Sequence, residues 1–157
     1  MTTLRLSMAI VLTGVLAVAA CRGDAHGNPP GASEAPAAES GTTPFTVSVA
    51  TPTLKAGASA DAKVTVTPAT GYHWNLEYPA KLVFEGSPSK VALTKKEFNQ
   101  LSGDFQASET KADIAVALQG KDPGKETLKG ELKFSVCNDT TCLIKSAPVE
   151  LAVVVSP

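Results

Sequence analysis

The chain has 157 residues, of which 18% are charged, and its 14 basic and 15 acidic residues give a formal net charge of −1 at pH 7. This balance, with no cluster of basic residues, argues against a protein that binds nucleic acid. Charge alone identifies no partner, and the length suits a single modest core.

The first 20 residues have the features of a bacterial secretory signal. Arg5 supplies positive charge, residues 8–20 are largely apolar, and small residues stand directly before Cys21. The apolar run is too short for a lasting membrane span. Small residues followed by cysteine resemble the lipobox of bacterial lipoproteins, whose cysteine is lipidated and becomes the mature N-terminus. We therefore expect a lipoprotein signal peptide over residues 1–20 and a lipid anchor on Cys21. An ordinary cleaved signal with an incidental cysteine is the alternative.

Residues 21–44 join this anchor to the rest of the chain. They are rich in Gly, Pro, Ala, Ser and Glu and contain almost no large apolar residue, so they cannot bury enough surface to offset the entropy of ordering. We expect a disordered tether, in which His26 is solvated. Arg22 directly after the lipidated cysteine resembles lipoproteins sent to the outer membrane, which predicts a lipid-anchored, periplasm-facing protein of the bacterial cell envelope.

Residues 45–157 alternate apolar with polar or small residues at a period of two, as half-buried strands do. The clearest segments are residues 45–49, 64–67, 82–84, 114–118, 132–136 and 149–155, and turn-forming residues stand between them at 56–57, 69–71, 86–88 and 122–124. Many short strands with no helical period predict an all-β fold, an immunoglobulin-like antiparallel β-sandwich.

Two cysteines remain after Cys21, and both lie near one predicted turn. Residues 138–141 are rich in turn formers, so a four-residue hairpin loop would place Cys137 opposite Cys142, and Pro148 would interrupt the returning strand at an edge. Facing strand residues have Cα atoms roughly 4.5 to 5.5 Å apart, within the range of about 4.4 to 6.8 Å that a disulfide needs. A disulfide is therefore plausible in an extracytoplasmic compartment.

Such a disulfide closes only a small loop, which weakens its value as a structural bond. The chain-entropy model gives roughly 2 kcal/mol for a loop of this size, against about 4.7 kcal/mol for a loop near a hundred residues. Strained or exposed disulfides are also the more easily reduced ones. The residues by themselves leave a structural bond and a redox switch both open.

A resemblance bears on this choice. Residues 134–143, with the sequence FSVCNDTTCL, follow the segments GYHWN at 71–75 and YPAKL at 78–82. In this order and spacing they resemble the N-terminal periplasmic domain family of the thiol:disulfide interchange protein DsbD. The resemblance covers most of residues 45–155. It implies a β-sandwich whose cysteine pair cycles between dithiol and disulfide without a cofactor, with Cys142 forming the mixed disulfide and Cys137 resolving it.

The resemblance also implies residues around the pair. The family shields its cysteines with a loop that carries a Glu-Phe pair, which corresponds to Glu97 and Phe98, with Phe105 as a competitor for the role. His73 and Asn75 lie where some relatives have tyrosines, so they would flank the pair. The alternatives are that Phe98 is an ordinary core or loop aromatic and that His73 makes a structural hydrogen bond.

The chain contains neither the electron-carrying membrane region nor the thioredoxin-like domain of the full-length family protein. Any interchange activity would therefore depend on a membrane electron donor of DsbD type and on periplasmic thioredoxin-like proteins. A non-catalytic envelope lipoprotein with a structural disulfide is the main alternative. A metal site is disfavoured because Cys137, Cys142 and His73 fall short of a closed zinc or copper ligand set, and no motif suggests a hydrolase.

Overall fold

A computed structural model of the protein describes residues 43–157. The predicted signal peptide (1–20), the lipidation site Cys21 and the tether as far as residue 42 lie outside the described residues. The first strand, β1, begins at Phe45. Within residues 43–157, no helix has the length and hydropathy needed to cross a bilayer.

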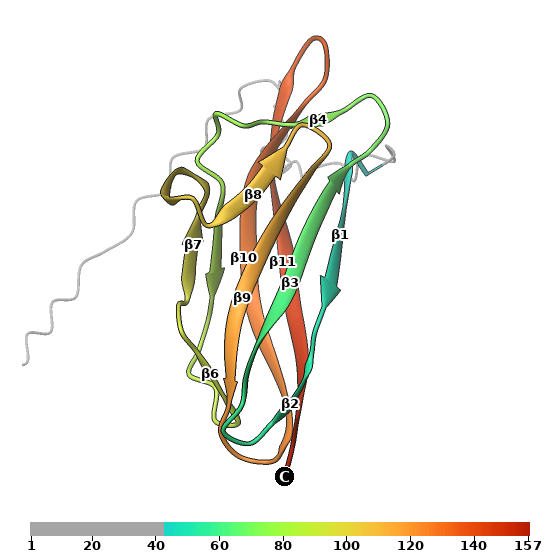
Figure 1. Ribbon diagram of the computed structural model, residues 1–157. Helices are drawn as coiled ribbons and strands as arrows, with labels where there is room; N and C mark the ends of the chain where they lie inside the picture. Colours follow the sequence, from blue (N-terminus) through green and yellow to red (C-terminus); the bar gives the residue numbers. More distant parts are fainter. Residues whose placement is uncertain (1–42) are drawn as a thin grey trace, which may run out of the picture. The chain divides into compact units, whose positions relative to one another are not determined.

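The described residues form two β-sheets that face each other (Figure 1). The first sheet has five strands: β1 (Phe45–Ala50), β3 (Ser59–Pro68), β9 (Lys111–Gly120) and β6 (Val91–Leu93) in that order, with β8 (Phe105–Ser108) also paired to β9. The second has six: β2 (Thr53–Lys55), β11 (Cys142–Ser156), β10 (Gly124–Cys137), β5 (Lys81–Phe84) and β7 (Glu97–Asn99), with β4 (His73–Trp74) also paired to β10. All pairs are antiparallel except β2 with β11. The predicted all-β, immunoglobulin-like sandwich is confirmed.

The core lies between the sheets and follows from the period-two pattern. In β3 and β9 the alternate residues Val64, Val66, Ile114 and Val116 are completely buried, while their neighbours lie on the outer face. Among the described residues, a single 3₁₀ turn (η1, Gln100–Ser102) follows β7. The Gln100 side chain joins this turn to residues 74–76 by hydrogen bonds.

The longest feature of the second sheet is the β10–β11 hairpin, in which all 14 residues of β10 pair with β11. It begins at Gly124 opposite Val155 and ends at Cys137 opposite Cys142. The cysteines therefore lie at one end of the sandwich, at the end opposite the C-terminus (Figure 1). Pro148 does not interrupt β11, contrary to the prediction. β2 pairs with β11 only at 154–156, so the missing N–H of proline faces an edge with no strand partner in the described residues.

Candidate functional site

Cys137 and Cys142 form a disulfide across the end of the hairpin. The Asn138 N–H donates to the Thr141 carbonyl at 2.9 Å, so the cysteines occupy the adjacent position, at which facing strands exchange no hydrogen bonds. Side chains lie closest at such positions. The two Cα atoms are 3.9 Å apart, closer than the roughly 4.5 to 5.5 Å expected for facing residues. The covalent bond brings the strand ends together.

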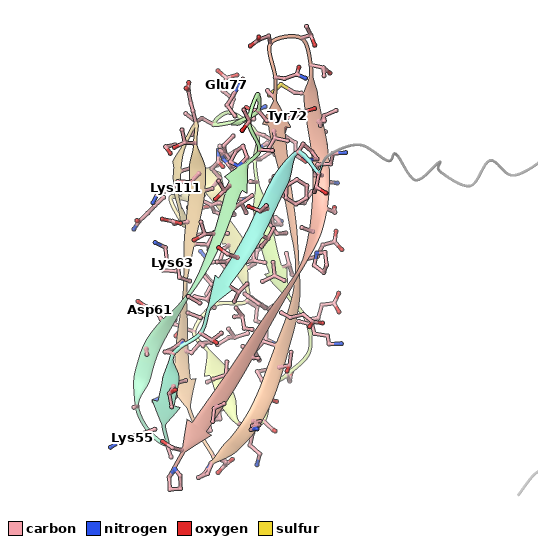
Figure 2. All side chains as sticks on the ribbon, turned by 90° about the vertical axis from the view of Figure 1, so that its right-hand side faces the viewer. Lys55, Asp61, Lys63, Tyr72, Glu77 and Lys111 are labelled. Carbon is pink, nitrogen blue, oxygen red and sulfur yellow. A yellow bond between two sulfur atoms is a disulfide. The ribbon has the colours of Figure 1, made fainter. Side chains whose placement is uncertain are left out.

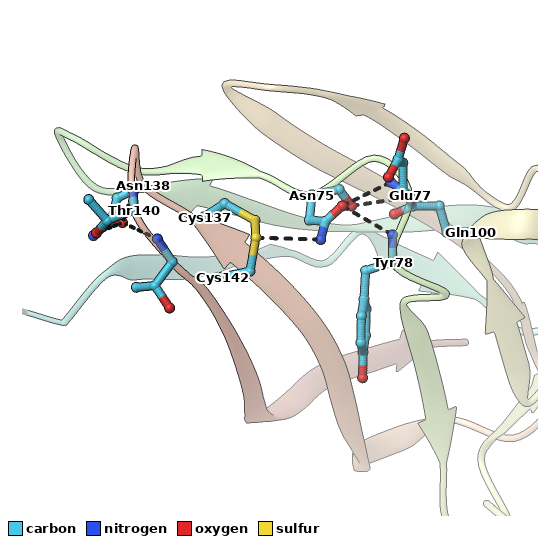
Figure 3. The surroundings of a disulfide bond; sticks show 9 residues. Asn75, Glu77, Tyr78, Gln100, Cys137, Asn138, Thr140 and Cys142 are labelled. Atoms are coloured by element: carbon cyan, nitrogen blue, oxygen red, sulfur yellow. Dashed lines mark hydrogen bonds between the residues drawn. A yellow bond between two sulfur atoms is a disulfide. The ribbon is translucent and has the colours of Figure 1, made fainter.

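The loop of this hairpin has a support of its own. The Asn138 side-chain oxygen accepts hydrogen bonds from the Thr140 N–H at 3.0 Å, the Thr141 N–H at 2.9 Å and the Thr140 hydroxyl at 3.1 Å (Figure 3). This is the way in which an asparagine side chain stabilises a turn. The turn geometry therefore does not depend on the disulfide alone.

The two sulfur-bearing residues differ in exposure. Cys137 lies between β4 and β11 and is only 5% exposed, whereas Cys142, at the beginning of β11, is exposed. An incoming thiolate must approach the sulfur that it attacks. The accessible position is Cys142, and the covered one is Cys137.

Trp74, next to His73 in β4, packs into the core on the face of the sheet opposite the disulfide. Its side chain is buried, stacks on Phe134 with ring centroids 5.2 Å apart, and lies 6.2 Å from the ring of Phe105. Its indole N–H donates to Gln100 Oε1 at 2.8 Å, which connects β4 to η1. Sequence reasoning singled out neither Trp74 nor Gln100 as part of the site. A lone tryptophan in a segment next to His73 and Asn75 was the available signal.

Asn75 contacts the exposed sulfur. Its Oδ1 accepts hydrogen bonds from the N–H groups of Glu77 at 3.0 Å and Tyr78 at 3.2 Å, so its Nδ2 faces the other way, 4.0 Å from Cys142 Sγ (Figure 3). Its backbone N–H donates to the Ser135 carbonyl at 3.0 Å, which fixes the segment against β10. The structure thus brings Asn75 to the cysteine pair, as the resemblance implied, and gives one sulfur a polar N–H neighbour.

His73 is brought to the other cysteine. The β4–β10 register pairs His73 with Cys137 and Trp74 with Val136. Because Trp74 and Val136 point into the core, His73 and Cys137 lie on the outer face, side by side. His73 is exposed and accompanies both cysteines in one surface depression.

That depression is open and has a volume of about 450 Å³. It is lined by His73, Trp74, Asn75, Leu76, Glu77, Glu109, Cys137, Asn138 and Cys142. The lining combines an exposed sulfur, an imidazole, an amide and two carboxylates. The imidazole can exchange a proton with a thiol placed above Cys142, and the amide can donate a hydrogen bond to its sulfur.

Phe98 and Glu97 are not brought to the pair, which corrects the expectation of a cap. Phe98 in β7 faces Leu82, which in turn faces Leu132 of β10. Cys137 lies five residues further along β10, or about 16 Å. Phe98 is buried edge-on against Phe84, and Glu97 pairs with Lys81 at 2.8 Å. Phe98 is a core aromatic, which was the alternative to a cap, because β7 pairs with β5 near the middle of the sheet and not at the end that carries the cysteines.

No group of three or more histidine, cysteine, aspartate or glutamate side chains within residues 43–157 is arranged to hold a metal ion.

No family model and no curated protein matches the chain. Solved structures with a similar course of the chain include a PapD-like domain of human CEP192, at 8% sequence identity and a TM-score of 0.41, covering 81% of this chain and 98% of that one. Another is AggA, the major subunit of an aggregative adherence fimbria of Escherichia coli, at 11% identity and a TM-score of 0.35, covering 73% of this chain and 97% of that one.

Proposed function

We propose that this domain is a thiol:disulfide exchange module, in which Cys137 and Cys142 alternate between disulfide and dithiol and relay reducing equivalents. The observation that carries the proposal is the asymmetry of the pair. Cys142 is exposed at an open depression, whereas Cys137 is covered and already in position to form or release the bond. Exchange needs one accessible and one resolving sulfur.

In the direction that accepts electrons, a partner thiolate attacks Cys142 Sγ. The Cys137–Cys142 bond breaks, Cys137 leaves as a thiolate that takes up a proton, and a mixed disulfide joins Cys142 to the partner. A second partner thiolate then attacks the partner's own sulfur in this bond and releases Cys142. The pair has gained two electrons, and the partner has become a disulfide. The donating direction is the reverse sequence on an acceptor disulfide.

The hairpin suits this cycle because it does not need the bond to persist. The β10–β11 ladder and the Asn138 hydrogen bonds hold the two strand ends together. The disulfide adds only about 2 kcal/mol in the chain-entropy model. Opening it therefore leaves the two thiols near each other and ready to close again.

The proposal extends to the setting of the protein. Cys21 would carry a lipid that holds the protein in the bacterial cell envelope, facing the periplasm. The partners would be a membrane electron donor of DsbD type and periplasmic thioredoxin-like proteins, since the pair needs a source of electrons and an acceptor for them. The resemblance of residues 71–82 and 134–143 to the DsbD N-terminal domain family supports this assignment.

The reduction potential of the pair tests the proposal. We would equilibrate the protein with Cys21 replaced by serine in graded thiol–disulfide buffers and trap the free thiols. A potential between about −270 and −120 mV is expected for a carrier. A potential well below roughly −300 mV would mark a permanent bond and reject the proposal.

Trapping of partners tests the roles of the two cysteines. The Cys137→Ser variant should accumulate mixed disulfides through Cys142, because the resolving sulfur is gone. The matched Cys142→Ser variant should accumulate few, because Cys137 is 5% exposed. If Cys142→Ser captured partners and Cys137→Ser did not, the assigned roles would be reversed.

A structural disulfide in a non-catalytic envelope lipoprotein is the second candidate. The burial of Cys137 favours it, because a covered sulfur is protected from stray thiols. The same potential measurement separates the two functions.

A further inference from the structure

Each sulfur of the pair has a different polar neighbour. Asn75 Nδ2 lies 4.0 Å from Cys142 Sγ and can donate a hydrogen bond to it, but an amide takes up no proton near neutral pH. His73 lies next to Cys137, because the β4–β10 register pairs the two residues. Imidazole is the side chain that gains and loses protons in the physiological pH range.

The arrangement across the outer face of the sheet is a row of three. His73 on β4 faces Cys137 on β10, and Cys137 faces Cys142 on β11. Facing residues in antiparallel strands have Cβ atoms about 4.5 to 5.5 Å apart. The imidazole is thus adjacent to the covered sulfur and one strand further from the exposed one. From this position the imidazole is within range of the thiol that must resolve a mixed disulfide.

Other titratable groups face the same space and compete for the role. Glu77, next to β4 in sequence, and Glu109, whose carbonyl accepts the Trp74 N–H at 2.8 Å, both line the depression. Asp139 is exposed in the hairpin loop. Among the described residues that line the depression, His73 is the only one able to carry a positive charge, and so the only one whose protonated form would attract a thiolate.

We propose that His73 is the proton acceptor for Cys137 during resolution of the mixed disulfide, and the proton donor to it in the reverse direction. This rests on the proposed exchange function. The Cys137 thiol passes its proton to the imidazole, and the thiolate attacks Cys142 Sγ. The Cys137–Cys142 bond forms, the bond from Cys142 to the partner breaks, and the partner leaves as a thiolate that recovers a proton from the imidazolium or from water. The pair loses two electrons, and the partner gains them.

The size of the effect has an upper bound. An ordinary cysteine thiol, with a pKa of about 8.5, is only about 3% thiolate at pH 7. Complete conversion to thiolate would therefore increase the resolution rate about thirtyfold at most. Above about pH 9 an ordinary thiol is mostly thiolate without help, and the advantage disappears.

An aromatic disulfide with a coloured leaving thiol, 5,5′-dithiobis(2-nitrobenzoate), separates the two steps. The reduced full-length protein with Cys21 replaced by serine retains two of its three cysteines. The first coloured thiol is released when Cys142 attacks the reagent, at a rate that rises with reagent concentration. The second is released when Cys137 attacks Cys142, at a rate independent of that concentration. The second rate measures resolution directly.

We expect His73→Gln to slow the second phase about tenfold at pH 7, to leave the first phase within about twofold, and to match the parent protein above about pH 9. His73→Ala, which opens space beside Cys137, should regain rate when imidazole is added. Glu77→Gln and Glu109→Gln are the matched controls. They should keep the second phase and its pH dependence.

The proposal is overturned if His73→Gln leaves the second phase unchanged at pH 7, if it slows the reaction equally at every pH, or if a glutamate variant abolishes the pH dependence instead. These outcomes are distinct from failure of the exchange function. A reduction potential well below roughly −300 mV would reject the exchange function whatever the rates show. Unchanged rates in His73→Gln would reject only the role of His73, and the reduction potential would still be that of a carrier.

Discussion

The two ends of the sandwich are built differently. At one end, the β10–β11 hairpin, β4 and the segment that follows it surround an open depression with an exposed sulfur. At the other end, the turn between β9 and β10 packs against the β2–β3 turn. Figure 2 shows Tyr72 and Glu77 near the first end and Lys55 at the second.

The second end is closed by backbone contacts. Gly57 N–H donates to the Gly120 carbonyl, and Gly120 N–H donates to the Ala58 carbonyl, both at 2.9 Å. Glu126 accepts hydrogen bonds from three successive backbone N–H groups, those of residues 89–91, at 2.9, 2.6 and 3.2 Å. This end is held by many non-covalent bonds that stay formed, whereas the only disulfide of the described residues stands at the open end. This placement fits the proposed exchange function, in which the bond opens and closes, better than a purely structural role.

The largest expected effect comes from Trp74, the core residue of β4. Trp74→Ala should lower the free energy of unfolding by about 3 to 5 kcal/mol, because it removes a large buried side chain and leaves Gln100 without its indole donor. It should also speed reduction of the disulfide by small thiols, because Trp74 packs on Phe134 of β10 and its loss loosens the β4–β10 pairing beside Cys137. Urea titration and thiol-trapping kinetics measure the two effects.

Phe98→Ala is the matched control for Trp74→Ala. It removes a buried aromatic of the same sheet, about 16 Å along from the cysteine pair, and should destabilise the protein without changing the rate of disulfide reduction under conditions in which it is folded. Faster reduction in folded Phe98→Ala would restore the idea that this ring covers the pair.

At the closed end, Gly120→Ala should cost about 1 to 3 kcal/mol of unfolding free energy. A Cβ atom there would collide with the backbone carbonyl of Lys55 and press on Val155, and a backbone carbonyl cannot rotate away as a side chain can. The rate of disulfide reduction should stay that of the parent. A variant that is as stable as the parent would show that this end is less tightly packed than the structure indicates.

The contrast between the ends could be predicted only in part. Alternating residues predicted the strands, and turn formers between Cys137 and Cys142 predicted the hairpin, because both signals are local in sequence. Which strands lie side by side in a sheet, by contrast, depends on residues that are far apart in the sequence. The sequence shows that Glu97 and Phe98 precede a strand, but it does not show which strand β7 pairs with. The prediction that these two residues cap the cysteines was therefore wrong. The exposure of Cys142 and the burial of Cys137 depend on β4, which has only two residues and no period to detect.

Removing the disulfide should have a smaller and more local effect. The double variant with both Cys137 and Cys142 replaced by serine should lose about 2 kcal/mol or less relative to the oxidised parent. Amide hydrogen exchange should quicken in residues 138–141 and stay unchanged at Gly120 and Lys121. Global destabilisation well above this value would indicate a structural bond and would count against the exchange function.

The smallest expected effect concerns the pH dependence of the closed end. Burial raises the pKa of Glu126, but the three backbone N–H donors and the charge of Lys90 lower it more, so its pKa lies below the ordinary value of 4.5. A carboxyl whose pKa is lower in the folded state contributes stability above its unfolded pKa and loses it as pH falls through the folded pKa. Glu126→Gln keeps one acceptor oxygen and should cost roughly 1 kcal/mol at pH 7.

The difference between Glu126→Gln and the parent should shrink as pH falls below about 4.5. Asp113→Asn, on the five-stranded sheet, provides the comparison. Hydrogen bonds from Lys63, Thr65 and Lys111 lower the pKa of Asp113 to about 2. Its difference from the parent should therefore persist to lower pH, disappearing only as pH approaches about 2. Urea titrations between pH 2 and pH 7 measure both differences. If the Glu126→Gln difference were constant over this range, the three N–H contacts would not depend on the carboxylate charge, and the closed end would be held by packing alone.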